Sequence, residues 1–424
     1  MWRCRPRCER RHWARATIQP MTTRPEDLGF SSERLRRVDD ATHAYVDKGK
    51  LPGVQTLISR RGELVHHDCY GFADVEAETA TTPDTLYRIY SMTKPITSVG
   101  LMMLFEEGKF LLENPVSRFL PEFADVQVWD GGTAEEPQTR PPARPITVHD
   151  VLTHMSGLTY GFHFQHPVDE MYRNNGLGDF SEPSFDLAEG MARLASLPLL
   201  FDPGSRWNYS MSTDVCGRLI EVMSGQSLDE YLRDHVLDPL GMSDTAFCAL
   251  EADLDRCSPL YVRGNDGKLK VMAPARTMVA PPKFLSGGGG LVGTGRDYMR
   301  FCNMLLGGGQ LDGVRLLSSR TVGYMARNHL PDGKLLNEVG QSTFSEAAME
   351  GTGFGLGFST VEDAAALQNL ASEGEFSWGG AASTAFWVDP DEEICVVFMT
   401  QLLPSDTYPI RRQLRAAVLQ ALVD

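Results

Sequence analysis

The sequence predicts an α/β (α+β) fold, in which helices flank an antiparallel sheet and a second domain is mostly helical. Strand patterns occur near both ends of the 424-residue chain, and helical patterns fill its middle. Strands from both ends of a chain often meet in one sheet, and the middle then forms an insertion. We therefore expect an α/β domain made of residues 22–118 and 286–424, and a mostly helical domain over residues 119–285.

Two hairpins account for the predicted sheet. The first has an apolar run at residues 54–59, a turn at Arg60-Arg61-Gly62 and an alternating run at residues 63–70. The second has runs at 382–388 and 394–400 around Asp389-Pro390-Asp391. Such runs on either side of Gly, Pro or Asp are typical of β-hairpins.

Helix signals follow in the middle and at the end of the chain. Thr147 and Asp150 form a capping-box pattern that opens a helix over residues 148–154, and a further helix over 215–224 stops at Gly225. Residues 131–145 are rich in Pro, Gly and charge, which predicts a surface loop. Apolar residues recur at helical spacing after residue 409, at Ile410, Leu414, Val418 and Leu422.

The amino-acid composition limits the classes of partner that we expect the protein to bind. The formal net charge is -16, which argues against nucleic acid, since binding to phosphates needs clustered Lys and Arg. We find no apolar run of about 18 residues, so no membrane span is expected. Residues 1–21 are rich in arginine and have no apolar segment, which predicts a disordered arm rather than a secretory signal, with Met21 as a candidate start.

The cysteines favour a cytoplasmic protein with reduced thiols. The eight cysteines are scattered and form no CxxC pair. Cys4, Cys8 and His12 recur at a spacing of four, but no fourth ligand follows them in the arginine-rich arm. We also expect no metal at His66-His67, which lie in a predicted strand, and no cofactor.

The stretch Ser91-Met-Thr-Lys94, followed by Pro95, has the features of a reactive helix start. Proline is best tolerated in the first turn of a helix, so the helix should begin within a few residues of Ser91. Residues three apart share a helix face, which brings the Lys94 ammonium to the Ser91 hydroxyl. A serine nucleophile needs a base, and burial at the positive end of a helix lowers a lysine pKa toward a usable value. An N-capping serine beside a solvated lysine would give the same short pattern.

Two later stretches bear on this choice. Tyr209 follows Pro203-Gly204, and it is either a buried ring or a proton carrier near a lysine charge. The stretch Ser377-Trp-Gly-Gly-Ala-Ala382 leads into the predicted C-terminal strand, where two glycines allow a ligand to approach the backbone closely. The run Gly287–Gly290 predicts a tight backbone segment beside a site.

Ser91-Met-Thr-Lys94, Tyr209-Ser210 and Trp378-Gly-Gly380, in this order, resemble the three motifs of the serine β-lactamase-like superfamily. The match is closest to family VIII carboxylesterases, which are relatives of class C β-lactamases. Residues 146–158 and 238–242 resemble connecting stretches of that family, and the resemblance covers about residues 22–424. It implies the serine β-lactamase-like fold, with the site between the sheet and the helical domain.

The resemblance also implies roles. Ser91 would be the nucleophile, and Lys94 and Tyr209 would activate it and transfer protons, with the choice of general base left open. The backbone N–H groups of Ser91 and Ala381 would form the oxyanion hole. An acyl-enzyme would form with loss of the alcohol, and water would then hydrolyse it. The implied substrate contacts come from Tyr90, Met211, Trp378, Gly379 and Gly380.

Two positions depart from the β-lactamase pattern. The third motif of β-lactamases begins with a lysine that binds the substrate carboxylate, whereas this chain has Trp378 there. The second motif normally has asparagine two residues after its tyrosine, and here that residue is Met211. Both changes favour a neutral ester over an anionic lactam, and these bulky side chains favour short acyl groups.

We therefore expect a cytoplasmic serine carboxylesterase for small acyl esters, with no prediction of its oligomeric state. The alternatives are an acyltransferase on the same site, a β-lactamase or D-alanyl peptidase, and a catalytically silent binding protein. The Gly-x-Ser-x-Gly elbow of α/β-hydrolases does not occur in the sequence. His154 lies between apolar residues, so we expect a core histidine rather than a triad member.

Overall fold

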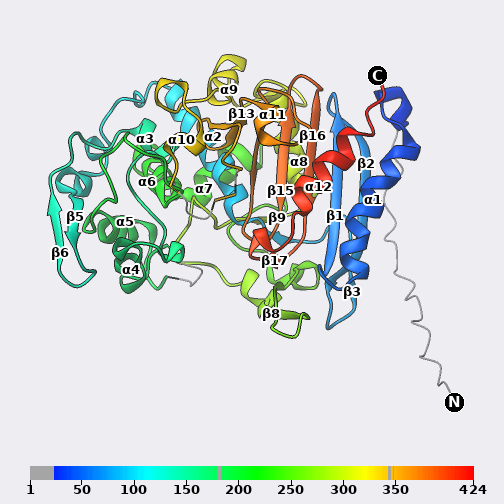
Figure 1. Cartoon of the computed structure of the whole chain (residues 1–424), viewed down its shortest axis with the longest axis horizontal. Helices are drawn as coiled ribbons and strands as arrows, with labels where there is room; N and C mark the ends of the chain where they lie inside the picture. The colour runs from blue at the N-terminus through cyan, green and yellow to red at the C-terminus, as the bar shows by residue number, and fades with distance from the viewer. Residues whose placement is uncertain (1–22, 179–182, 342–344, 347) are drawn as a thin grey trace.

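The computed structural model describes residues 23–178, 183–341, 345–346 and 348–424. The predicted basic arm, with Cys4, Cys8 and His12, lies outside the described residues. An eight-stranded antiparallel sheet has the order β12-β13-β14-β15-β16-β1-β2-β3, with helices α3 to α7 gathered to one side of it (Figure 1). The strand bounds are β1 Gly53–Arg60, β2 Glu63–Asp74, β3 Thr79–Ala80, β12 Thr352–Phe354, β13 Ser359–Val361, β14 Phe376–Gly379, β15 Ala385–Asp389 and β16 Ile394–Met399.

Both predicted hairpins are confirmed. β1 pairs with β2, and the turn at Arg61 and Gly62 has φ values of 53° and 81°, as a type I′ turn requires. β15 pairs with β16 across the turn that follows Asp389. β1 also lies beside β16, with Gln55 opposite Met399, so strands from the two ends of the chain meet inside the sheet.

Helices cover both faces of the sheet, which confirms the predicted fold class. α1 (Ser32–Asp47) and α12 (Ile410–Leu419) pack together on one face, and α8 (Gly295–Leu306) packs on β1, β15 and β16 from the other (Figure 1). Successive residues of β16 alternate between the two hydrophobic cores. The strand is therefore apolar at every position, although its side chains point alternately to opposite faces.

The helical region is built around α6 (Ser212–Ser224), which contacts α2, α3, α5 and α7. α6 ends at Gly225, whose φ of 77° is the left-handed conformation of a helix C-cap, as the sequence predicts. The predicted capping box is also present, because Thr147 Oγ1 accepts from Asp150 N at 3.2 Å and Asp150 Oδ2 accepts from Thr147 N at 2.8 Å. The remaining bounds are α2 Thr93–Glu106, α3 Val148–Leu152, α4 Pro167–Asn174, α5 Leu187–Ala195 and α7 Leu228–Leu232.

Strands also occur between residues 119 and 285. The predicted surface loop contains part of a hairpin, β5 (Val128–Gly132) with β6 (Pro137–Arg140). This hairpin is mostly solvent-exposed and polar, so no apolar alternation marks it. β7 (Leu260–Arg263) runs parallel to β17 (Leu402–Leu403), which joins the region to the C-terminal part of the chain. The boundaries of the two domains stay a prediction.

Most cysteines are buried in the structure. All six cysteines in the described ranges are free, and all but Cys248 are buried. Within those ranges, no helix is both long and apolar enough to cross a membrane.

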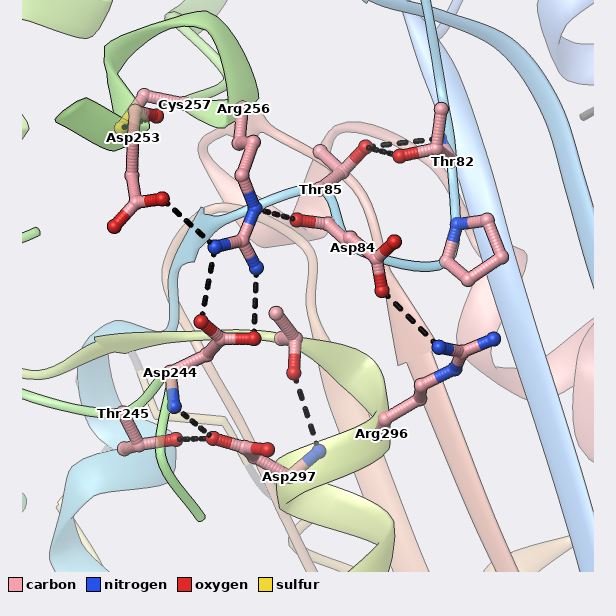
Figure 2. A network of polar contacts seen from close by, with 12 residues as sticks. Thr82, Asp84, Thr85, Asp244, Thr245, Asp253, Arg256, Cys257, Arg296 and Asp297 are labelled. Atoms are coloured by element: carbon pink, nitrogen blue, oxygen red, sulfur yellow. Dashed lines mark hydrogen bonds and ion pairs between the residues drawn. The ribbon is translucent and has the colours of Figure 1, made fainter.

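A polar network around Arg256 joins the helical region to the chain that precedes α2 (Figure 2). The Arg256 guanidinium donates to both carboxylate oxygens of Asp244, at 3.0 and 2.7 Å, and to Asp253 at 3.0 Å. It also donates to the carbonyl of Asp84 at 2.9 Å, while the Arg256 carbonyl accepts from the N–H of Leu86 at 2.8 Å. The segment that leads to Ser91 is therefore tied to this arginine.

The network continues onto α8. Arg296 donates to the Asp84 carboxylate at 3.1 Å (Figure 2). The Asp297 carboxylate accepts from Asp244 N at 2.8 Å and from the Thr245 hydroxyl at 2.9 Å. The Asp297 carboxylate thus links residues 244–245 to α8, and the Asp84 carboxylate links α8 to the segment that precedes α2.

Replacement of Arg256 should destabilise the fold. The change Arg256→Ala leaves Asp244 and Asp253 without their charged donor, and partial solvent screening limits the loss to about 1–2 kcal/mol of unfolding free energy. Chemical denaturation measures the change. The control is Arg276→Ala, which breaks an exposed ion pair with Glu251 and should change the stability little. Equal losses in both variants would contradict the role of the network.

Candidate active site

Ser91 lies at the point where the chain enters α2. Tyr90–Met92 form a single 3-10 turn, and α2 begins at Thr93, so the predicted helix start is confirmed. Tyr90 has a φ of 44°, a left-handed conformation that costs a non-glycine residue about 1 kcal/mol or more. The neighbour of Ser91 is thus held in a strained conformation, a feature that is common in active sites.

The structure brings Ser91, Lys94 and Tyr209 together. Lys94 Nζ lies 3.2 Å from Ser91 Oγ, and the Tyr209 hydroxyl donates to the same oxygen at 2.5 Å. Lys94 Nζ also lies 4.5 Å from the centre of the Tyr209 ring. The serine oxygen therefore contacts an amine and a phenol at once, which excludes the alternative of a solvated lysine beside a capping serine.

Lys94 is removed from water. Its side chain is in the core, with the residue only 1% exposed, and Nζ donates to the carbonyl of Gly288 at 2.6 Å. Burial lowers the pKa of Lys94 to about 7, although the charges of Asp214 and Glu346 act in the opposite direction. A large fraction of the amine is therefore unprotonated at neutral pH.

Asp214 and the glycine run complete the surroundings of Lys94, and the sequence analysis did not find this aspartate. The Asp214 carboxylate accepts from Ser286 Oγ at 2.6 Å and from Gly288 N at 3.1 Å. A Cβ atom on Gly288 would lie 2.8 Å from Asp214 Oδ2, so only glycine lets the backbone pass there. Burial raises the pKa of Asp214. Asp214 lies three residues beyond Met211, in the first turn of a helix, and this position is the one indication of its role in the sequence.

Tyr209 is enclosed by aromatic rings. Burial raises its pKa well above 10, so the phenol is protonated at neutral pH. The His154 ring lies 5.2 Å from the Tyr209 ring and bonds Ser210 through Nδ1 at 3.1 Å. His154 is fully buried, and burial lowers its pKa well below the usual value. The prediction of a satisfied core histidine is confirmed.

Trp378, Gly379 and Gly380 lie behind the cavity wall. The Trp378 ring packs against the Tyr209 ring, with centroids 5.4 Å apart, and its residue is buried. Cβ atoms on Gly379 and Gly380 would lie 2.5 Å from the Arg411 guanidinium and 2.3 Å from the Ile89 carbonyl. Both positions therefore require glycine because other parts of the protein, rather than a ligand, approach the backbone closely there.

Arg411 fixes the backbone beside Ser91. Its guanidinium donates to the carbonyls of Gly380 at 2.7 Å and Thr384 at 2.6 Å, and it pairs with Glu346 at 2.5 Å. The C=O and N–H groups of a trans peptide point in opposite directions, so the Ala381 N–H points away from this arginine. Sequence reasoning missed Arg411 and Glu346, which lie far from the three motifs along the chain.

A cavity of about 330 Å³ opens onto these groups. Ser91, Tyr209, Ala381, Tyr90 and Met211 line it, whereas Trp378, Gly379 and Gly380 are not among its described lining residues. Tyr160 and Phe162 form part of the wall. Most other lining side chains are apolar, among them Leu177, Phe247, Met278 and Phe284.

The burial of Lys94 should cost stability. Unfolded chains bind a proton at this lysine up to about pH 10.4, but the native state loses it near 7. The Lys94→Met variant should therefore unfold at higher denaturant concentration than the wild type at pH 7. Its advantage should shrink by about 1.4 kcal/mol for each pH unit from 7 toward 10, because the wild type releases a proton on folding throughout this range and that release becomes less costly as the pH rises.

Denaturant titrations at several pH values measure this difference. The surface variant Lys268→Met is the control, and its difference from the wild type should stay small and constant with pH. A constant difference for Lys94→Met as well would contradict the lowered pKa.

Comparisons with known proteins identify the family of the chain. A family model described as Beta-lactamase matches residues 38–420. Protein Rv1367c of Mycobacterium tuberculosis is 36% identical over 363 residues, which cover 84% of this chain and 88% of that protein. Esterase EstB of Burkholderia gladioli is 31% identical over 381 residues, covering 86% of this chain and 89% of that protein.

A solved structure gives the same result. EstCE1, described as a hydrolase with promiscuous acyltransferase activity, has a TM-score of 0.77 at 27% identity, covering 91% of this chain and 98% of that one. The family match spans nearly all of the described chain, and the fold is the same. The protein is therefore a hydrolase of the beta-lactamase family, and its resemblance to the serine β-lactamase-like superfamily is confirmed.

Proposed function

We propose that the protein is a serine carboxylesterase of the family VIII type, which hydrolyses small acyl esters through an acyl-enzyme on Ser91. One observation carries the proposal: Ser91 Oγ lies within hydrogen-bond distance of both the Tyr209 hydroxyl and the buried Lys94 amine. A serine hydroxyl needs a base at this distance to become a nucleophile.

In the proposed acylation step, unprotonated Lys94 accepts the proton of Ser91 as Oγ attacks the ester carbonyl carbon. Tyr209 donates its proton to the departing alkoxide and regains one from Lys94. We assign the base to Lys94 because a phenol with a pKa well above 10 is a poor base and a suitable acid at neutral pH. Water then attacks the acyl-enzyme by the same proton transfers in reverse.

The proposed oxyanion hole consists of the N–H groups of Ser91 and Ala381. Both residues line the cavity, and Arg411 orients the Gly380–Ala381 peptide through its carbonyl. Arg411 would therefore act as a positioning residue. Loss of one donor in such a pair typically costs about 3 kcal/mol of transition-state stabilisation.

The volume and the lining of the cavity favour a small substrate. A volume of about 330 Å³ is at the low end for a ligand pocket, and its apolar wall suits a short acyl chain. Esterase EstB is a relative whose name states an esterase activity. A lysine to bind a lactam carboxylate is missing from position 378, so we rank β-lactam hydrolysis below both ester hydrolysis and acyl transfer. We keep the expectations of a small-molecule acyl ester as the partner and a cytoplasmic location as part of this proposal.

Acyl transfer is the second candidate function, because EstCE1 combines hydrolysis with promiscuous acyltransferase activity. The same acyl-enzyme would serve both reactions, and an alcohol would replace water in the second step. Competition between water and an added alcohol, followed through the ester formed, separates the two.

Substitution of the three polar residues tests the proposal. Hydrolysis of p-nitrophenyl butyrate by Ser91→Ala should fall by about 10⁴-fold or more, because the nucleophile is lost. Lys94→Ala and Tyr209→Phe should each lose about 10²–10⁴-fold in kcat. Ser196→Ala, an exposed serine of the helical region, is the control and should keep full activity. Unchanged turnover in Ser91→Ala would rule out this mechanism.

The pH dependence tests the assignment of the base. Because protonated Lys94 cannot accept a proton, kcat/KM should fall about tenfold per pH unit below about 7 and level off above it. Tyr209→Phe should lower the plateau and leave the inflection near the same pH. An inflection that disappears in Tyr209→Phe would instead identify the tyrosine as the base.

A further inference from the structure

Two aspartate–histidine pairs face each other between α1 and β2. Asp39 and His43 are four residues apart on α1, and His66 and Asp68 are two residues apart on β2, so each pair shares one face of its element. His43 Nε2 lies 2.6 Å from Asp68 Oδ2, and His66 Nε2 lies 3.1 Å from Asp39 Oδ1. None of the four is among the described residues that line the active-site cavity.

The potential ligand atoms are close enough for one ion. One ligand atom from each of Asp39, His43 and Asp68 lies within 4.8 Å of the others. His66 Nε2 lies 3.1 Å from Asp39 Oδ1, at the side of this group of three. Ligands about 2.1 Å from a tetrahedral zinc ion lie about 3.4 Å apart, so small movements of these side chains would centre them on one ion.

A second observation also indicates a missing ligand. Asp39 Oδ1 and His66 Nε2 are buried atoms that contact each other at 3.1 Å, but neither makes a hydrogen bond of good geometry among the described residues. Buried polar atoms are rarely left unsatisfied, because each such atom costs about 1–3 kcal/mol. A metal ion between the two atoms would satisfy both.

The surroundings suit a divalent ion. Two carboxylates balance the charge of a dication and two imidazoles add nitrogen donors, and this set of donors is typical of zinc and its neighbours in the first transition row. The His43 ring stacks on Tyr70 with 3.7 Å between the ring centres, and the Tyr70 hydroxyl donates to Asp47 at 2.8 Å. These contacts orient the imidazole, as outer contacts of metal ligands commonly do.

We propose that Asp39, His43, His66 and Asp68 form a binding site for a zinc-like divalent ion that cross-links α1 to β2. The expectation of no metal at His66-His67 rested on two adjacent strand residues. His67 indeed faces the other side and contacts Gln55 at 3.0 Å, while His66 meets ligands supplied by α1. The site is structural and does not depend on the proposed esterase activity.

Zinc titration of the metal-free full-length protein tests the site. All samples carry Cys4→Ser and Cys8→Ser, so that the N-terminal arm cannot bind zinc through these thiols. Calorimetry should show one zinc ion per chain, and the double variant Asp39→Asn/His66→Gln should bind at least about 100-fold more weakly. Saturating zinc should raise the Tm of the parent and leave that of the double variant unchanged.

Controls separate loss of the site from loss of the fold. His43→Gln should show the same loss of zinc affinity, and His235→Gln, outside the cluster, should bind like the parent. Circular dichroism establishes that each variant is folded. Cobalt should give the intense visible bands of a tetrahedral site in the parent alone. Equal zinc affinity in the parent and in the folded double variant, or no zinc binding by the parent, would overturn the proposal.

Discussion

The exclusion of water from the Lys94 amine is the constraint on which the rest of the site depends. A lysine can share a proton with Ser91 only when its charged form is destabilised, and no single segment achieves this. The glycine run supplies a carbonyl, the loop before α6 supplies the Tyr209 ring, and Tyr160 closes a further side. Two large hydrophobic cores offset the unfavourable desolvation of this amine. The site is therefore a product of the whole fold rather than of a local motif.

The position of Ser91 is fixed from two sides. Arg256 bonds the segment that precedes it, and the strained Tyr90 forms the last link before the serine. Arg411 fixes the Gly380–Ala381 peptide on the opposite side, and its charge is balanced by the buried Glu346. Both arginines donate hydrogen bonds to backbone carbonyl groups. They therefore fix the course of the backbone on either side of Ser91. Rigid placement of this kind is what preorganised stabilisation of a developing charge requires.

The local parts of this arrangement could be predicted from the sequence. Alternation and turn residues identified both hairpins, and the spacing of Ser91, Lys94 and Pro95 identified the helix start. The contacts that Arg411 and Asp214 make with distant segments could not be predicted, because neither periodicity nor capping encodes them. Arg411 and Asp214 gain their importance only from the strand and loop they meet in space. The hairpin β5–β6 escaped prediction because its residues are mostly exposed and carry no apolar alternation.

The pairing of β1 with β16 has a consequence for how the molecule acquires its structure. Gln55 lies opposite Met399, so the middle of the sheet joins β1 to β16, which is far from it along the chain. Contacts at such separation in the chain close large loops and slow the search for the native topology. During synthesis, β1 lacks this neighbour until residues 394–399 have left the ribosome. The helical region is made before these residues, so β1 keeps an unpaired edge, which can pair with other chains, while that region is synthesised.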